Sequence, residues 1–95
     1  MRSNRYHMER LKQGMVVQYF KGEDLDRSAG NMSYLYKIIG IAEHTEIGEN
    51  LVIYQALYNP YAMFVKPYSK FTSVVNKEKY PKVKQHYIFE EFKLK

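Results

Sequence analysis

Residues 42–50 hold the side chains best suited to chemistry. His44, Thr45 and Glu46 follow one another, with Glu43 and Glu49 on either side. A base, a hydroxyl and carboxylates within reach of one another could polarise a water, hold a hydroxyl of a ligand or bind a metal ion. A plain polar turn between two strands would contain the same residue types, with His44 and Thr45 bonding the turn's backbone. The residue types alone leave both interpretations open.

Other kinds of reactive site find little support in the sequence. The chain has no cysteine, which excludes disulfides, thiolate nucleophiles and thiolate metal sites. Its histidines lie far apart at positions 7, 44 and 86, and its glycines are isolated, so no phosphate-binding loop is predicted. We therefore assign no catalytic residue, no metal ligand and no cofactor, and we favour a binding protein over an enzyme.

Aromatic and basic residues form a second candidate site. The sequence contains 10 Tyr and 5 Phe. Tyr19 and Lys21 stand at the end of a predicted first strand. Tyr54 and Tyr58 lie four apart on a predicted central strand, and the set continues along the chain with Tyr61, Phe64, Lys66 and Tyr68. Aromatic faces beside lysines can stack the bases of single-stranded nucleic acid, but large rings are equally what a short chain needs to fill a thin core.

Charge is unevenly distributed along the chain. The formal net charge is +5, with Lys and Arg concentrated toward both ends and acidic residues in positions 23–50. Such a field can attract a polyanion, or the lysines can serve to keep an aromatic-rich domain soluble. The partners that fit are a single-stranded nucleic acid, a nucleotide or another protein.

No apolar run approaches the roughly 18–20 residues of a membrane span, and residues 1–14 are too charged for a signal peptide. We therefore expect a cytoplasmic protein without a membrane partner.

Short strands must position these residues. Aromatic and β-branched runs predict strands at 15–20, 34–42, 51–58, 62–66, 72–75 and 85–92, with a bulge or a close approach of the backbone at Gly40. Loops are expected at 23–33, 43–50, 59–61 and 76–84, and a helical turn at 67–71. The predicted fold is mainly β, either a small antiparallel SH3-like barrel or a strongly bent sheet of about five or six strands. It is formed by residues 14–95 as a single domain, after a polar arm of residues 1–13.

Four motifs, taken in order, resemble a bacterial family called domain of unknown function 1653. They are Phe20-Lys21-Gly22, the stretch from Tyr36 to Glu46, the strand from Glu49 to Tyr58, and Val65-Lys66-Pro67 followed by Phe71. Together they cover about residues 14–92, and the joint occurrence of the His-Thr-Glu segment and the Tyr-x-x-x-Tyr strand is specific. The resemblance strengthens the fold and the location of the site without supplying an activity.

The chain departs from the pattern of that family at two site positions. Tyr19 stands where the family usually has His, so an activity that used this His would be altered here. Lys66-Pro67 replaces Arg-Pro, which keeps the charge and loses bidentate recognition of an anion. The loop at 23–33 is also longer than the link expected in the family.

The leading hypothesis is a non-catalytic binding module. Its ligand would lie at an aromatic and basic face near the His44-Thr45-Glu46 segment. The candidate binding residues are Tyr19, Lys21, His44, Thr45, Glu46, Tyr54, Tyr58 and Lys66. Two alternatives stand beside it: a small metal-assisted or hydrolase-like enzyme that uses His44 and Glu46, and a protein–protein interaction domain with exposed strand edges.

Overall fold

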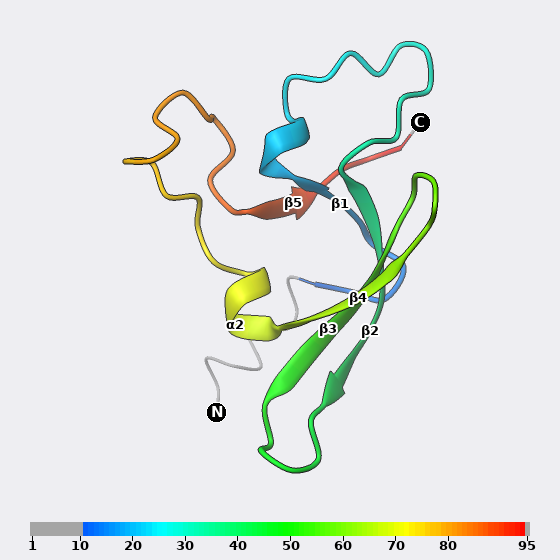
Figure 1. Cartoon of the computed structure of the whole chain (residues 1–95), viewed down its shortest axis with the longest axis vertical. Coiled ribbons are helices and arrows are strands. Elements are labelled where there is room, and N and C mark those ends of the chain that lie inside the picture. Colours follow the sequence, from blue (N-terminus) through cyan, green and yellow to red (C-terminus); the bar gives the residue numbers. More distant parts are fainter. Residues whose placement is uncertain (1–10, 95) are drawn as a thin grey trace.

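The protein has a mainly β fold built on one antiparallel sheet, as predicted (Figure 1). The structure, a computed structural model, describes residues 11–94. The strands are β1 (Val16–Tyr19), β2 (Leu35–Glu43), β3 (Asn50–Ala56), β4 (Met63–Pro67) and β5 (Phe89–Glu91), in the order β4-β3-β2-β1-β5. They do not close into a barrel, so β4 and β5 are the two edges of an open sheet.

The sheet curls strongly across its strands. Tyr54 lies on β3 and Phe89 on β5, with β2 and β1 between them. Adjacent strands lie about 4.8 Å apart, so in a flat sheet these two positions would be separated by roughly 14 Å. Their ring centroids are only 5.6 Å apart. Because side chains stand roughly perpendicular to a sheet, this contact requires a concave face.

Strand register sets which residues point toward the concave face. Burial alternates along β3, and Val52, Tyr54 and Ala56 are its buried residues. Phe64 of β4 lies beside Tyr54, and Lys66 lies beside Val52, so both β4 side chains share that face. Of the two roles predicted for Gly40, the bulge is confirmed, because the β2–β3 register shifts between Ile38 and Gly40. A Cβ at Gly40 would meet nothing within 4 Å, so the backbone makes no close approach there.

Two short helical segments and the core complete the fold. The 3₁₀ turn η1 (Phe20–Gly22) follows β1 directly, and the helix α2 (Tyr68–Phe71) follows β4 where a helical turn was predicted. Phe71 packs flat on Phe89, with centroids 4.1 Å apart and 2° between the ring planes, and so joins α2 to β5 over the concave face. Among residues 11–94, no helix has the length and apolar composition needed to cross a membrane.

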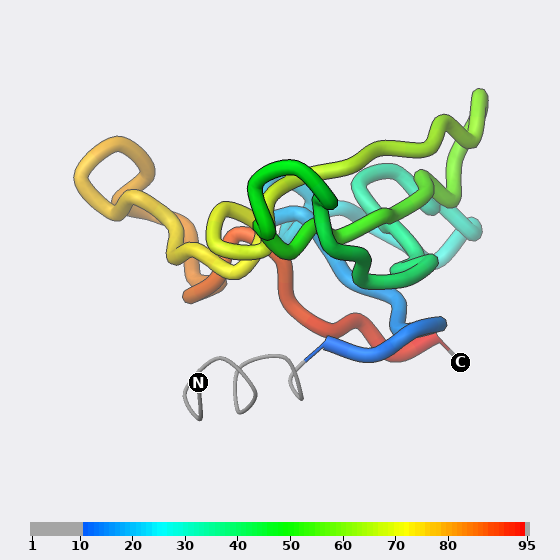
Figure 2. The backbone as a smooth tube through the Cα atoms, turned by 90° about the horizontal axis from the view of Figure 1, so that it is seen from below, coloured from blue at the N-terminus to red at the C-terminus, as the bar shows by residue number. Residues whose placement is uncertain are grey.

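The first residues of the described chain and the segment after α2 differ from the sequence prediction. Leu11, which the sequence placed in the polar arm, is buried in the core at 4% exposure. Residues 1–10 of that arm lie outside the described residues. The strand predicted at 72–75 is wrong: only one isolated bridge forms, between Val74 and Tyr87. Figure 2 shows the following segment, residues 76–84, looping out at one side of the molecule.

The last strand is shorter than predicted because its partner ends. Tyr19, the last residue of β1, pairs with Phe89, and the chain enters η1 at Phe20. β5 therefore begins only at Phe89. Before it, the buried Gln85 side chain donates from Nε2 to the backbone oxygens of Gln18, Tyr87 and Ile88, at 2.9, 2.9 and 3.1 Å.

Candidate ligand-binding site

An open pocket of about 220 Å³ lies on the concave face of the sheet. We call it the aromatic pocket, because six rings and a single lysine line it: Tyr19, Tyr34, Tyr36, Tyr54, Phe64, Phe89 and Lys66. The rings come from β1, β2, β3, β4 and β5, and Tyr34 immediately precedes β2. Curling of the sheet therefore gathers rings from every strand into one site.

Tyr36 is the central ring of the aromatic pocket. Its centroid lies 5.4 Å from Tyr54, 6.2 Å from Phe64 and 5.8 Å from Phe89, with interplanar angles of 73°, 73° and 79°. Such edge-to-face contacts match the positive edge of one ring to the negative face of another. The rings thus hold one another in place around Tyr36.

The phenol of Tyr36 is held by Tyr58. Their hydroxyl oxygens lie 2.6 Å apart, and either can donate. Burial, followed by this hydrogen bond, raises the pKa of Tyr36 above its ordinary value of 10.0. Burial also raises the pKa of Tyr54. Both phenols are therefore kept neutral, so the rings present uncharged surfaces to the pocket.

Lys66 is the one charged side chain among the described residues that line the aromatic pocket. It is half-buried near the end of β4, two residues after Phe64 and on the same face. A flexible ammonium at the wall of an aromatic pocket can meet an anionic group of a ligand. The aromatic pocket can therefore bind a planar ring through its faces and a negative charge through Lys66.

The Phe20-Lys21-Gly22 motif shapes the neighbouring surface. Phe20 is buried, and its neighbour Lys21 is exposed. A Cβ on Gly22 would lie 2.6 Å from the Cβ of Tyr34, so only glycine allows this close approach. Tyr34 in turn packs on Tyr19 with centroids 6.0 Å apart. The motif therefore seats Tyr34 at the wall of the aromatic pocket.

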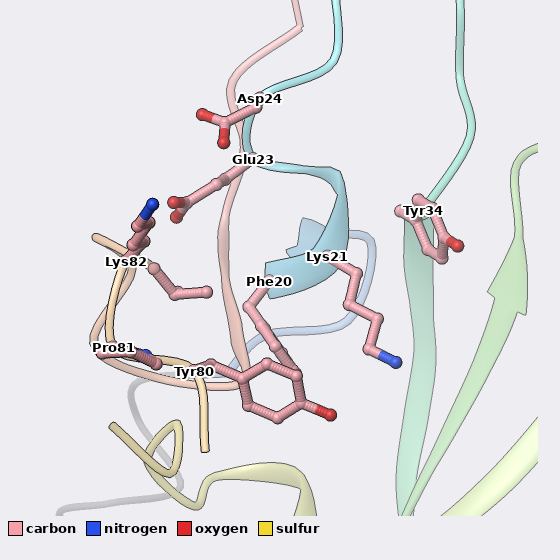
Figure 3. Close-up of a pocket in the computed structure, with 9 residues that line it drawn as sticks. Phe20, Lys21, Glu23, Asp24, Tyr34, Tyr80, Pro81 and Lys82 are labelled. Atoms are coloured by element: carbon pink, nitrogen blue, oxygen red, sulfur yellow. The ribbon is translucent and has the colours of Figure 1, made fainter. Parts of the chain in front are cut away.

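A second pocket, of about 670 Å³, opens beside η1 (Figure 3). Its lining residues come from η1 and the loop after it, from Tyr34, and from the 76–84 segment: Phe20, Lys21, Glu23, Asp24, Tyr34, Tyr80, Pro81, Lys82 and Val83. Phe20 and Tyr80 pack edge to face at 4.9 Å, and the Lys21 ammonium lies 5.7 Å from the centre of the Tyr80 ring. Lys21, a predicted binding residue, thus belongs to this second pocket.

The His44-Thr45-Glu46 segment forms the hairpin turn between β2 and β3. His44 Nδ1 accepts a hydrogen bond from the backbone N–H of Glu46 at 3.2 Å. Gly48, with a φ of 73°, donates to the backbone oxygen of His44 at 2.7 Å and closes the turn. Thr45 and Glu46 are exposed, and none of the three residues lines either pocket. Within residues 11–94, no three His, Cys, Asp or Glu side chains come together as a metal-binding group.

The structure thus separates the predicted binding residues into groups. Tyr19, Tyr54 and Lys66 meet in the aromatic pocket, and Tyr58 supports it through Tyr36. The remaining predicted residues lie in the second pocket and in the hairpin turn. The candidate binding residues left out four members of the aromatic pocket: Tyr34, Tyr36, Phe64 and Phe89. Of these four, only Phe64 belonged to the aromatic and basic set identified in the sequence. For Phe64 a signal was present, because a residue two positions before Lys66 on a strand shares its face.

Comparison with known proteins agrees with the motifs. The family model described as "Protein of unknown function (DUF1653)" matches residues 15–90. Neither a curated protein nor a solved structure matches the chain. The matched range contains both pockets and the hairpin turn, and it spans most of the sequence. The chain therefore belongs to the DUF1653 family of proteins of unknown function.

Proposed function

We propose that this domain is a non-catalytic binding module that holds a planar ring of its ligand, together with an attached negative charge, in the aromatic pocket. One observation carries the proposal: six aromatic rings and one half-buried lysine line a single pocket. Ligand pockets are mostly apolar, with a few placed polar groups that fix orientation. A nucleotide, which joins a planar base to a phosphate, has the matching chemistry.

The size and the charge of the aromatic pocket restrict the kinds of ligand that fit it. Sites for whole small molecules occupy about 300–1,000 Å³, so the 220 Å³ of the aromatic pocket suit one ring system with its substituent. Aromatic cages can also bind ammonium ligands, but Lys66 would repel a cation there. The ligand is therefore anionic. We also propose a cytoplasmic location, since a small domain without cysteine is typical of a reducing compartment.

The test is a titration with adenosine 5′-monophosphate (AMP), monitored by two-dimensional NMR. Uncharged adenosine serves as the control ligand. We expect saturable shifts at Tyr19, Tyr54 and Phe64 with AMP, and weaker binding of adenosine. Lys66→Gln should bring AMP binding down to that of adenosine, whereas Lys70→Gln, an exposed lysine on α2, should not.

A matched pair on β4 tests the pocket itself. Phe64→Ala removes a ring that lines the aromatic pocket and should abolish the AMP shifts. Val65→Ala changes the next residue, which is 59% exposed and points to the other side of the sheet, and should leave them intact. Equal loss in both variants, or no saturable shift in the unmodified protein, would exclude the proposed function.

A second candidate function is protein docking, and β4 favours it. This strand is an edge of the sheet, and Met63 and Val65 are 56% and 59% exposed on its far side from the pocket. An extended peptide could add to such an edge through main-chain hydrogen bonds. Val65→Lys should block peptide addition without changing AMP binding. The sequence also suggested catalysis by His44 with Glu46. Neither of these residues lines either of the two pockets, so the pockets do not support this alternative.

A further inference from the structure

Tyr34 lines both the aromatic pocket and the second pocket. Its φ of 65° is a left-handed conformation that a tyrosine rarely adopts. The contact with Gly22 and the stacking on Tyr19 hold it in this conformation. Strained residues of this kind cluster at functional sites. The two pockets therefore adjoin at a residue whose backbone is held in an unfavourable conformation.

The second pocket offers a further aromatic surface beside lysines. Tyr80 is half-buried against Phe20, and ammonium groups of Lys21 and Lys79 lie 5.7 and 5.6 Å from the centre of its ring. In Figure 3, Lys21 and Lys82 stand on opposite sides of this pocket. Both pockets therefore combine aromatic rings with lysine ammonium groups, and the two pockets adjoin.

Two acidic residues, Glu23 and Asp24, also line the second pocket. The Glu23 carboxylate accepts the backbone N–H groups of Lys84 and Gln85, both at 2.8 Å, so it serves to hold the 76–84 segment. Asp24 is exposed, and Figure 3 places it at the end of the pocket away from the Lys21 ammonium. A phosphate beside Lys21 would therefore lie away from the Asp24 carboxylate.

We propose that the two pockets form one groove that binds a single-stranded polynucleotide, with one base in the aromatic pocket and its neighbour on Tyr80. Single-strand binding sites combine aromatic rings, on which successive bases stack, with cations along the backbone. Lys66, Lys21 and Lys82 supply those cations, and the net charge of +5 favours a polyanion. This inference rests on the proposed function, because the first base takes the place of the planar group described there.

The test compares AMP with the dinucleotide pApA, in RNA and DNA forms, by titration of the whole chain. The dinucleotide should bind about 5- to 150-fold more tightly than AMP, the gain expected from one stacked base. Tyr80→Ala should remove this gain and leave AMP binding unchanged. Tyr61→Ala, an exposed tyrosine outside both pockets, should alter neither. The two sugar forms distinguish an RNA ligand from a DNA ligand.

Salt dependence provides a second measurement that does not depend on Tyr80. Each phosphate contact in a single strand contributes about −0.7 to the slope of log K against log salt concentration. With poly(A) as the ligand, Lys82→Gln should reduce the magnitude of the slope by about this amount. Lys37→Gln, an exposed lysine on β2 outside both pockets, should leave the slope unchanged.

The outcomes separate this inference from the proposed function. If AMP binds but pApA binds no more tightly, the aromatic pocket stands as a nucleotide site and the groove is excluded. If neither binds, both proposals fail. If poly-glutamate competes with pApA as well as an unlabelled oligonucleotide does, the interaction is charge attraction alone, and the groove is likewise excluded.

Discussion

Gly22 is the residue at which the backbone approaches Tyr34 most closely. Gly22→Ala would bring a Cβ to 2.6 Å from that of Tyr34 and to 3.1 Å from Arg27 Nη2. We expect a loss of about 1–3 kcal/mol in the free energy of unfolding, the usual cost of overpacking. Chemical denaturation measures it. Gly40→Ala is the control, because a Cβ there meets nothing within 4 Å.

A double variant identifies the clash. Tyr34→Gly removes the Cβ that the new methyl group would strike, and glycine tolerates a φ of 65°. In that background, Gly22→Ala should cost much less. A Gly22→Ala penalty that stays the same with Gly at position 34 would show that Tyr34 is not the obstacle.

The Tyr36–Tyr58 pair permits a second prediction at a single hydroxyl. Tyr58→Phe removes the partner of the half-buried Tyr36 hydroxyl, at a cost of about 1 kcal/mol in the free energy of unfolding. Removing both hydroxyls should cost less than the sum of the single variants, since no unpaired group remains. Urea denaturation of the four proteins of this cycle provides the measurement. Additive losses would mean that the two hydroxyls do not interact.

Residue types allowed part of the site to be predicted. Tyr19, Tyr54 and Lys66 were identified because aromatic and basic residues near strand ends suit ligand binding. Phe89 could not be predicted as a site residue. Its strand lies beside β1, and the Phe89 ring reaches Tyr54 on β3 only because the sheet curls. Tyr34 could not be predicted as a site residue either, because only the close contact with Gly22 explains its backbone conformation. Long-range geometry, and not residue chemistry, decides both positions.

At the scale of elements, the loop of residues 23–33 is organised by Arg27. Its guanidinium donates to the backbone oxygens of Asn31 and Ser33, at 2.6 and 2.9 Å, and to Gln18 Oε1 at 3.1 Å. It also lies 5.2 Å from the centre of the Phe92 ring. A single side chain therefore ties the loop to itself, to β1 and to the C-terminal segment.

Arg27→Lys tests this organisation. A lysine keeps the charge but lacks the planar fork, so it cannot serve these acceptors together. We expect faster amide hydrogen exchange across residues 28–33, with protection in β2 and β3 unchanged. Uniformly faster exchange throughout the sheet would contradict a local role for Arg27.

Strand prediction succeeded where side chains alone determine the element. The runs that became β2, β3 and β4 are rich in aromatic and β-branched residues, and the bulge at Gly40 followed from a lone glycine in such a run. Residues 72–75 contain three β-branched residues but make only one bridge, at Val74. They follow α2, where Thr72 and Ser73 bond back to Tyr68 and Lys70 through their hydroxyls. Those local bonds compete with a strand ladder, and sequence periodicity does not reveal them.

At the scale of the whole molecule, the tyrosine-rich core makes stability depend on alkaline pH. The pKa of Tyr36 and that of Tyr54 are raised in the folded state, mainly by burial, above the ordinary value of 10.0. Below about pH 10 both phenols are protonated in the folded and unfolded chains, so their contribution to stability is fully present. Above it the unfolded chain ionises first, and the contribution is lost as pH rises toward the folded-state pKa values.

The free energy of unfolding should therefore fall from about pH 10 upward, by about 1.4 kcal/mol per pH unit for each phenol that stays protonated only in the folded chain. Urea denaturation across this range measures the slope, and Tyr36→Phe should make it shallower because one of the two phenols is gone. Tyr61→Phe is the matched control, since Tyr61 is 56% exposed and lies outside both pockets. If Tyr36→Phe left the alkaline slope as steep as Tyr61→Phe does, other groups would govern it. A shallower slope would instead connect the ring at the centre of the aromatic pocket to the pH range in which the whole domain is folded.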